Sequence, residues 1–148
     1  MNREILFRGK TTDGEWREGS LVIGELKGET VVQIRPFMNI HVTYFYGTCG
    51  MEVFPETVGQ FTGLTDRNGK KIFEGDIIKH HRHLWGEDVS DIGVVFWNAG
   101  TCQFRRTSSQ NGETPQIWQS SAEHYEVIGN VHDNPEWLER KNNERNFV

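Results

Sequence analysis

Residues 53–79 read VFPETVGQFTGLTDRNGKKIFEGDIIK, and their turn-forming residues set the organisation of the whole chain. Pro55 is placed to begin one helical turn. The run Asp66–Gly69 is a strong turn signal, because Asn and Gly both tolerate positive φ. A brief strand is expected at Lys71–Phe73, and a tight corner at Glu74–Asp76 precedes a further strand. The segment therefore predicts a structural joint between two β-rich parts of the chain.

Upstream of this joint, short apolar stretches alternate with glycine-containing turns, a pattern typical of a β meander. The expected strands lie at residues 3–9, 15–24, 29–35 and 40–46, and Pro36 ends the third of them. Strands joined by such short turns pair antiparallel. The sequence therefore predicts an N-terminal antiparallel β meander, within a subdomain of residues 1–62.

Downstream of the joint, residues 72–130 predict about five short strands, the spacing found in small barrels and sandwiches. A hairpin turn is expected at Asn98–Gly100. Two polar stretches, residues 80–91 and 108–115, are expected to be loops. We therefore predict an SH3-like barrel in a second subdomain, residues 63–148.

The end of the chain carries a helix-start signal, Asn134-Pro135-Glu136, with Asn as the cap, Pro at the first helical position and an acid in the first turn. The predicted fold class is thus mostly β. An antiparallel β meander is followed by a small SH3-like β-barrel and a short C-terminal helix, and the two subdomains are expected to form one compact unit.

The charge of the chain limits the classes of partner. It has 148 residues, with 16 Lys and Arg against 21 Asp and Glu, for a formal net charge of −5. Non-specific binding to a phosphate backbone needs clustered cations. The sequence shows no basic tail or run of that kind, which argues against such binding.

The cysteines and the apolar patterning favour a cytoplasmic location. Cys49 and Cys102 are too few for a disulfide framework and are expected to be reduced thiols. The sequence MNREILFRGK lacks the apolar core of a signal peptide. No apolar run approaches the roughly 20 residues of a membrane span, so no membrane partner is expected.

The run His80-His81-Arg82-His83 is the clearest candidate for metal chemistry. His80, His81 and His83 could supply imidazole ligands to Zn²⁺ or Ni²⁺, with Asp76, Glu87 and Asp88 close in sequence. The spacing is not diagnostic of a metal site, and a solvated polar loop explains it more simply. We therefore expect no cofactor, and keep a metal site at these histidines as an alternative.

A predicted hairpin offers the best local case for nucleic-acid binding. Trp97, Arg105 and Arg106 combine an aromatic ring with two cations, close to Phe104. Base stacking and phosphate contacts use such groups. The competing interpretation places Trp97 and Phe104 in the core and leaves both arginines solvated.

Other groups are better explained by structure than by chemistry. Glu74 and Asp76 could act as an acid and base pair, but one of them is expected to cap the tight corner. Cys49 lies between glycines, and we interpret it as a small apolar residue at a strand end. The sequence has no phosphate-binding loop, no dinucleotide fingerprint, no serine-hydrolase elbow and no HExxH helix.

Three segments, in this order along the chain, carry a family resemblance: FRGKTTDGEWREG (7–19), PETVGQFTGLTDRNGKKIFEGDII (55–78) and EVIGNVHDNPEWL (126–138). Together they resemble the YopX family of bacteriophage and prophage proteins. The resemblance implies a β-rich protein with a barrel-like C-terminal part that forms homo-oligomers. It implies no established activity, and the shared residues are mainly glycines and turn formers.

Taken together, these patterns favour a phage or prophage accessory protein that acts as a non-enzymatic module and docks a host or phage macromolecule. One alternative is a nucleic-acid-binding protein that uses the face of Trp97, Arg105 and Arg106. Another is a metal-dependent enzyme that uses His80–His83. We expect function to lie in the variable stretches beside the joint, residues 36–51 and 80–91.

Overall fold

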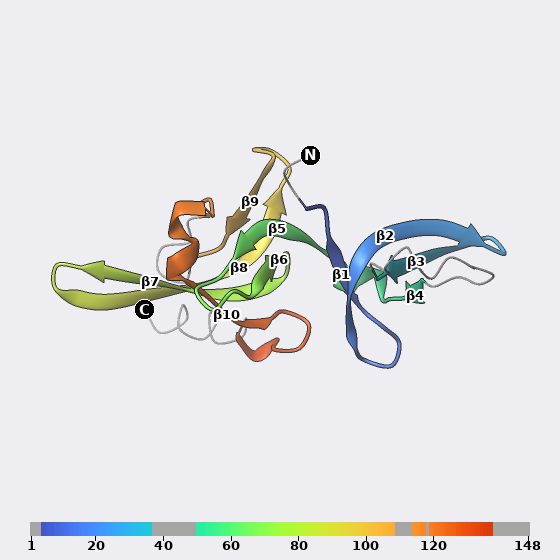
Figure 1. Cartoon of the computed structure of the whole chain (residues 1–148), viewed down its shortest axis with the longest axis horizontal. Helices are drawn as coiled ribbons and strands as arrows, with labels where there is room; N and C mark the ends of the chain where they lie inside the picture. The colour runs from blue at the N-terminus through green and yellow to red at the C-terminus, as the bar shows by residue number, and fades with distance from the viewer. Residues whose placement is uncertain (1–3, 37–49, 109–113, 118, 138–148) are drawn as a thin grey trace, which may run out of the picture. The chain divides into compact units, whose positions relative to one another are not determined.

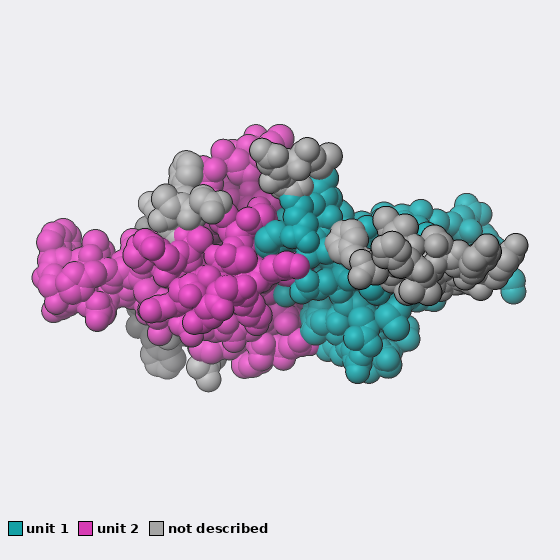
Figure 2. Space-filling view, in the orientation of Figure 1, with its two compact units in different colours: residues 1–61 teal, residues 62–148 magenta. Residues whose placement is uncertain are grey.

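The computed structural model describes residues 4–36, 50–108, 114–117 and 119–137. Contacts divide the chain into two compact units, residues 1–61 and 62–148 (Figure 2). The described chain is mostly β and its strands pair antiparallel, which confirms the predicted fold class at this level. No helix in the described ranges is long and apolar enough to cross a bilayer.

The strands are β1 (Phe7–Lys10), β2 (Trp16–Leu26), β3 (Glu29–Arg35), β4 (Met51–Glu52), β5 (Gly59–Thr65), β6 (Lys71–Phe73), β7 (Asp76–Leu84), β8 (Glu87–Asn98), β9 (Gln103–Arg106) and β10 (Tyr125–Asn130) (Figure 1). Two 3₁₀ turns accompany them, η1 (Pro55–Thr57) and η2 (Gln119–His124).

The first unit contains the predicted meander. β1 pairs antiparallel with β2, β2 with β3, and β3 with the short β4. β3 ends at Arg35, before Pro36, because proline cannot donate to the ladder. A small core of Val32, Ile34 and Val53 lies beneath this sheet. The strand predicted at 40–46 lies outside the described residues.

The second unit is built on a four-stranded antiparallel sheet, in the order β10-β7-β8-β9. Its core consists of buried apolar side chains from β6 to β10 and the segment before η2: Ile72, Ile78, Val95, Phe104, Ile117 and Tyr125. Among the described strands the order runs from β10 to β9 without closing, so the SH3-like barrel is not confirmed. Instead, β7 and β8 pair along one long hairpin, part of which projects from the sheet (Figure 1).

The predicted polar loop at residues 80–91 is wrong, because these residues form most of the β7–β8 hairpin. β7 and β8 remain paired from Ile77 and Val94 to Leu84 and Glu87. The turn between them is Trp85-Gly86, with φ values of 51° and 88°. Two consecutive positive φ values are the mark of a type I′ turn, whose twist matches that of a β hairpin. We call residues 81–90 the ribbon.

The predicted C-terminal helix is not confirmed. After β10, the Asn134 side chain accepts a hydrogen bond from the backbone N–H of Asn130 (3.3 Å), and its carbonyl accepts one from Trp137 (3.2 Å). These bonds close a tight turn at the end of β10. The continuation that a helix requires, residues 138–148, lies outside the described part of the chain.

Candidate functional site

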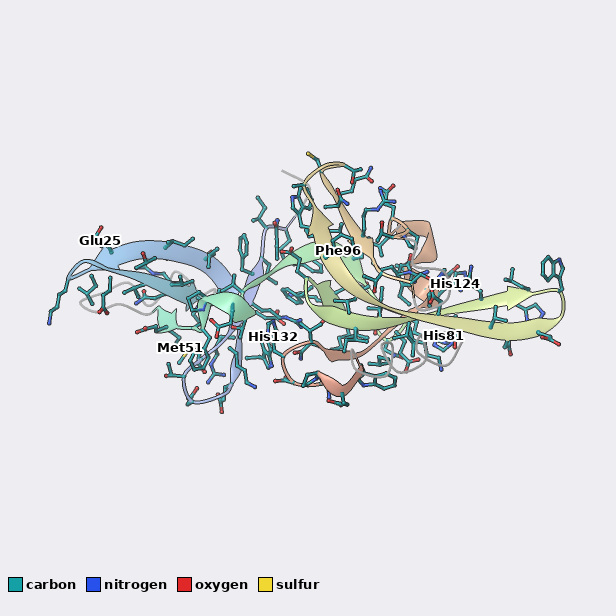
Figure 3. All side chains as sticks on the ribbon, turned by 180° about the vertical axis from the view of Figure 1, so that it is seen from behind. Glu25, Met51, His81, Phe96, His124 and His132 are labelled. Carbon is teal, nitrogen blue, oxygen red and sulfur yellow. The ribbon has the colours of Figure 1, made fainter. Side chains whose placement is uncertain are left out.

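The ribbon leaves one edge of β7 uncovered in the second unit. β10 pairs with β7 only from Asp76 to His80, whereas β8 pairs with it as far as Leu84. A cavity of about 450 Å³ lies beside the uncovered stretch, lined by β7, β8, η2 and the turn that holds Arg67. We call this cavity the ribbon groove. Figure 3 labels two residues of its wall, His81 and His124.

The ribbon groove concentrates cationic groups in a chain of net negative charge. Its lining includes Arg67, Lys79 and Arg82, and three histidines, His81, His83 and His124. The lining also includes the carboxylates of Asp88 and Glu123. The groove therefore presents permanent cations from two segments, together with carboxylates that can accept hydrogen bonds.

Each groove histidine lies against a carboxylate. The pairs are His81 Nε2 with Glu126 Oε2 at 2.8 Å, His83 Nδ1 with Asp88 Oδ1 at 2.9 Å, and His124 Nε2 with Glu123 Oε1 at 3.6 Å. These pairs occupy the acidic side chains nearest the cavity. Within the described residues, the side chains of Arg67 and Lys79 have no ion-pair partner.

Arg67 is positioned by the turn that the sequence singled out. The buried Asp66 carboxylate accepts hydrogen bonds from the backbone N–H groups of Asn68 (2.8 Å) and Lys70 (2.9 Å) through Oδ1. Its Oδ2 accepts a third from Val127 of β10 (2.9 Å). Asp66 is thus used inside the fold and leaves the neighbouring Arg67 side chain exposed to the groove.

A buried ion pair lies behind the groove, on the core side of β7. The side chains of Arg106 and Asp91 are 4% and 2% exposed, and Nη1 of Arg106 lies 2.5 Å from Oδ2 of Asp91. Arg106 Nη2 donates to Nδ1 of His80 at 3.1 Å, so this ring nitrogen carries no proton. The His80 ring also packs against Tyr125, with centroids 4.9 Å apart. This cluster fixes β7 on β8 and β9.

Burial and the nearby Arg106 guanidinium lower the pKa of His80 from 6.5 to about 4. Between these two values the unfolded chain binds more protons than the folded one, so folding stability falls as the pH falls. We expect His80 to contribute about 1–2 kcal/mol to the free energy of unfolding above pH 6.5, a figure that already allows for its partial exposure. This contribution should be lost as the pH falls towards 4.

The comparison that checks this pH dependence is urea unfolding of the wild type and His80→Asn at pH 7.5 and pH 4.5. Asn keeps an acceptor for Arg106 but does not titrate. The wild type should lose more stability than the variant between the two pH values. Parallel pH profiles would contradict the assignment.

The predicted metal ligands point in different directions. Pairing places His81 and His83 on one face of β7, with Ser90 and Asp88 opposite them on β8. His80 lies on the other face, toward Tyr125 and Arg106. Over the part of the chain that the structure describes, no group of three His, Cys, Asp or Glu residues is arranged to hold a metal ion.

The predicted nucleic-acid face is also divided. Trp97 is 43% exposed and packs edge-on against Phe104, with ring centroids 5.0 Å apart. Arg106, on the same face of the β8–β9 pair, is the buried partner of Asp91. Arg105 faces the opposite side, where its Nε donates to the carbonyl of Thr114. The three residues therefore do not form one surface.

The remaining candidates have structural positions. Asp76 is buried and its carboxylate accepts a hydrogen bond from the backbone N–H of Phe73 (2.8 Å), as expected of a capped corner. Cys102 is exposed, at the left-handed position of the β8–β9 turn (φ 51°). Cys49 lies outside the described residues.

Sequence reasoning missed Trp85, Arg67, Lys79 and His124. The dipeptide Trp85-Gly86 carried a signal for the ribbon, because glycine suits the second position of a type I′ turn. The groove residues carried none. They come from a turn, a strand and a 3₁₀ turn that only the fold brings together.

Comparisons with known proteins agree on the fold and name no activity. The chain is similar to the crystal structure of protein EF1440 from Enterococcus faecalis, with 22% identity and a TM-score of 0.51, over 93% of this chain and 99% of that one. At this identity the likeness shows the fold alone. A search of curated proteins gave no match. The family model described as YopX protein matches residues 7–139, nearly the whole chain, and the protein therefore belongs to the YopX family.

Proposed function

We propose that this protein is a phage- or prophage-encoded accessory module that acts in the bacterial cytoplasm and docks another protein through the tip of its β7–β8 ribbon. It performs no catalysis in this role. The observation that carries the proposal is Trp85, whose side chain is fully exposed (101% of its reference area) at the turn of the ribbon. Leu84 beside it is also exposed.

The turn itself does not require a tryptophan. The first central position of a type I′ turn has positive φ and favours Asn, Asp or Gly, whereas a bulky aromatic is unfavourable there. Trp85 holds this position with φ 51° and buries no surface within the chain. The fold therefore gives no reason for the indole, and a contact outside the chain supplies one.

A protein partner fits this tip better than other classes. Tryptophan is enriched among the residues that dominate protein interfaces. Burying its roughly 150–250 Å² at about 25 cal/mol per Å² contributes about 4–6 kcal/mol. The charged residues near the tip, the half-buried Arg82 and the exposed Glu87 and Asp88, include both signs, as is common at the rim of an interface. A second copy of this chain is one such protein, in keeping with the expected homo-oligomer.

Site-specific photo-crosslinking tests the proposal. A photo-reactive residue replaces Trp85 in one variant and Ile23 in the other. Ile23 is an exposed residue of β2 (66%) and serves as the control. We expect discrete protein adducts in living host cells from position 85 and none from position 23. An adduct of twice the mass of the chain would assign the ribbon to self-association. Absence of adducts, or equal adducts at both positions, would contradict ribbon docking.

Once the partner is known, Trp85→Ala should weaken its binding by about 30-fold or more, the effect of losing an interface anchor. Trp97→Ala is the matched control, because Trp97 is a second exposed tryptophan (43%) that lies on β8, away from the tip. Biolayer interferometry of the two variants makes the comparison.

Nucleic acid is the second candidate, favoured by an aromatic tip that adjoins a groove with arginine and lysine side chains. It ranks lower because Glu87 and Asp88 offset the cations of the ribbon. Salt-dependent retardation of labelled DNA or RNA that Trp85→Ala abolishes would favour it over a protein partner.

A further inference from the structure

We propose that the ribbon groove binds the phosphate group of a nucleotide-sized ligand through Arg67 and Lys79. The inference is independent of ribbon docking, because it rests on the cavity and not on the tip. It assigns a ligand class to a site built from a turn, two strands and a 3₁₀ turn of the second unit.

The first support is cationic charge in a concave site, where Glu126, which lies opposite Lys79 on β10, is paired with His81. The chain carries five more acids than bases, yet among the described residues Arg67 and Lys79 have no ion-pair partner. Asp66, adjacent to Arg67, is buried and accepts hydrogen bonds from three backbone N–H groups. Because these cations lie together in a concave site, an anion is the ligand that they favour.

The second support is the mixture of donors and acceptors. The planar arginine fork matches phosphate geometry, and lysine adds a point charge. The carboxylates of Asp88 and Glu123 also line the cavity, and each is paired with one histidine but keeps oxygen lone pairs that can accept hydrogen bonds from hydroxyl or amino groups. This set suits one phosphate attached to a polar organic body better than a bare anion.

The third support is size. The cavity measures about 450 Å³, within the range of about 300–1,000 Å³ typical of small-molecule sites. Inorganic phosphate alone would leave much of this space to water. A nucleoside monophosphate offers both the phosphate and the hydroxyl donors that the lining can satisfy.

The test is an NMR titration of the full chain with adenosine 5′-monophosphate, adenosine and inorganic phosphate at low salt. We expect saturable shifts of groove resonances with the monophosphate, and binding of adenosine at least tenfold weaker. Arg67→Gln and Lys79→Gln should each weaken binding of the monophosphate by about tenfold, because each loses one charge-assisted contact. Arg67→Lys, which keeps the charge, should fall between them and the wild type.

Lys70→Gln is the matched control. Lys70 is an exposed cation of the same turn as Arg67 but does not line the groove. Replacing it changes the net charge of the chain by the same amount as Arg67→Gln. Its effect should stay within about twofold, since the contact is remote and screened. A 5′-phosphorylated tetranucleotide distinguishes the source: tighter binding than the monophosphate assigns the phosphate to a nucleic-acid end, and equal binding assigns it to a free nucleotide.

The proposal fails if adenosine binds as well as its monophosphate, if the shifts lie outside the groove, or if Lys70→Gln weakens binding as much as Arg67→Gln. It also fails if no probe saturates. None of these results bears on ribbon docking, and loss of the Trp85 adducts would leave the titration unchanged.

Discussion

Asp91→Asn is expected to lower the free energy of unfolding by about 3–5 kcal/mol, the usual cost of removing one member of a buried ion pair. The Arg106 guanidinium is 4% exposed and would keep its charge after the change. Its other described contacts are the Thr107 carbonyl and the neutral His80 ring, neither of which carries a compensating charge. Urea denaturation at pH 7.5 measures the loss.

Two variants separate charge from packing. Asp88→Asn removes a carboxylate of the same strand that is 96% exposed, and should cost less than about 0.5 kcal/mol. The double variant Asp91→Leu, Arg106→Met replaces the pair with apolar groups and should recover most of the loss. An Asp91→Asn cost below 1 kcal/mol would show that water reaches the pair, in conflict with its burial.

Much of the β framework could be predicted from sequence because its signals are local. β3 and β6 have the predicted bounds, Glu29–Arg35 and Lys71–Phe73. In β3, β-branched residues continue almost to Pro36. β6 lies between a turn and a corner whose glycines, Gly69 and Gly75, both have positive φ. Proline and glycine end a strand through their effect on the local backbone, so the bounds of these two strands can be predicted without tertiary information.

The ribbon could not be predicted in the same way. Apolar alternation indicates a strand only when one face is buried, and both faces of the ribbon carry polar side chains. Its strands are held by the continuing ladder and by cross-strand contacts such as His83 with Asp88. A polar sequence of this kind looks like a loop until its partner strand is known.

The candidate site depends on residues far apart in the sequence. His81 meets Glu126 across 45 positions, and Arg106 is drawn into the interior by Asp91, 15 positions away. An arginine beside an exposed hairpin turn is normally solvated, so its burial cannot be inferred without the partner. Residues 36–51, a second region where we expected function, lie mostly outside the described part, which omits residues 37–49.

Asp66→Ala is expected to cost about 3–5 kcal/mol, because it leaves three backbone N–H groups without their acceptor, at about 1–3 kcal/mol for each one that water does not reach. The donors are Asn68 and Lys70 in the turn and Val127 in β10. The residue therefore joins the joint segment to the sheet of the second unit. Thermal and urea unfolding both measure the loss.

Asp66→Asn gives a graded comparison, since its amide oxygen can still serve the turn while its NH₂ group faces Val127. It should cost roughly half as much as Asp66→Ala and leave the chain folded. A cost equal to that of Asp66→Ala would mean that the turn bonds add little and that the bond to β10 dominates.

The same variant links the stability of the turn to the ribbon groove. Arg67 follows Asp66 directly, and its backbone N–H donates to the carbonyl of Tyr125 (2.9 Å) at the start of β10. Weakening the Asp66 bond to Val127 would loosen this attachment and with it the placement of the guanidinium. Folded Asp66→Asn should therefore bind adenosine 5′-monophosphate several-fold more weakly, although Asp66 does not line the cavity. Unchanged affinity would show that Arg67 reaches the phosphate without a fixed turn. In that case the joint would be a purely structural element, as its sequence alone suggested.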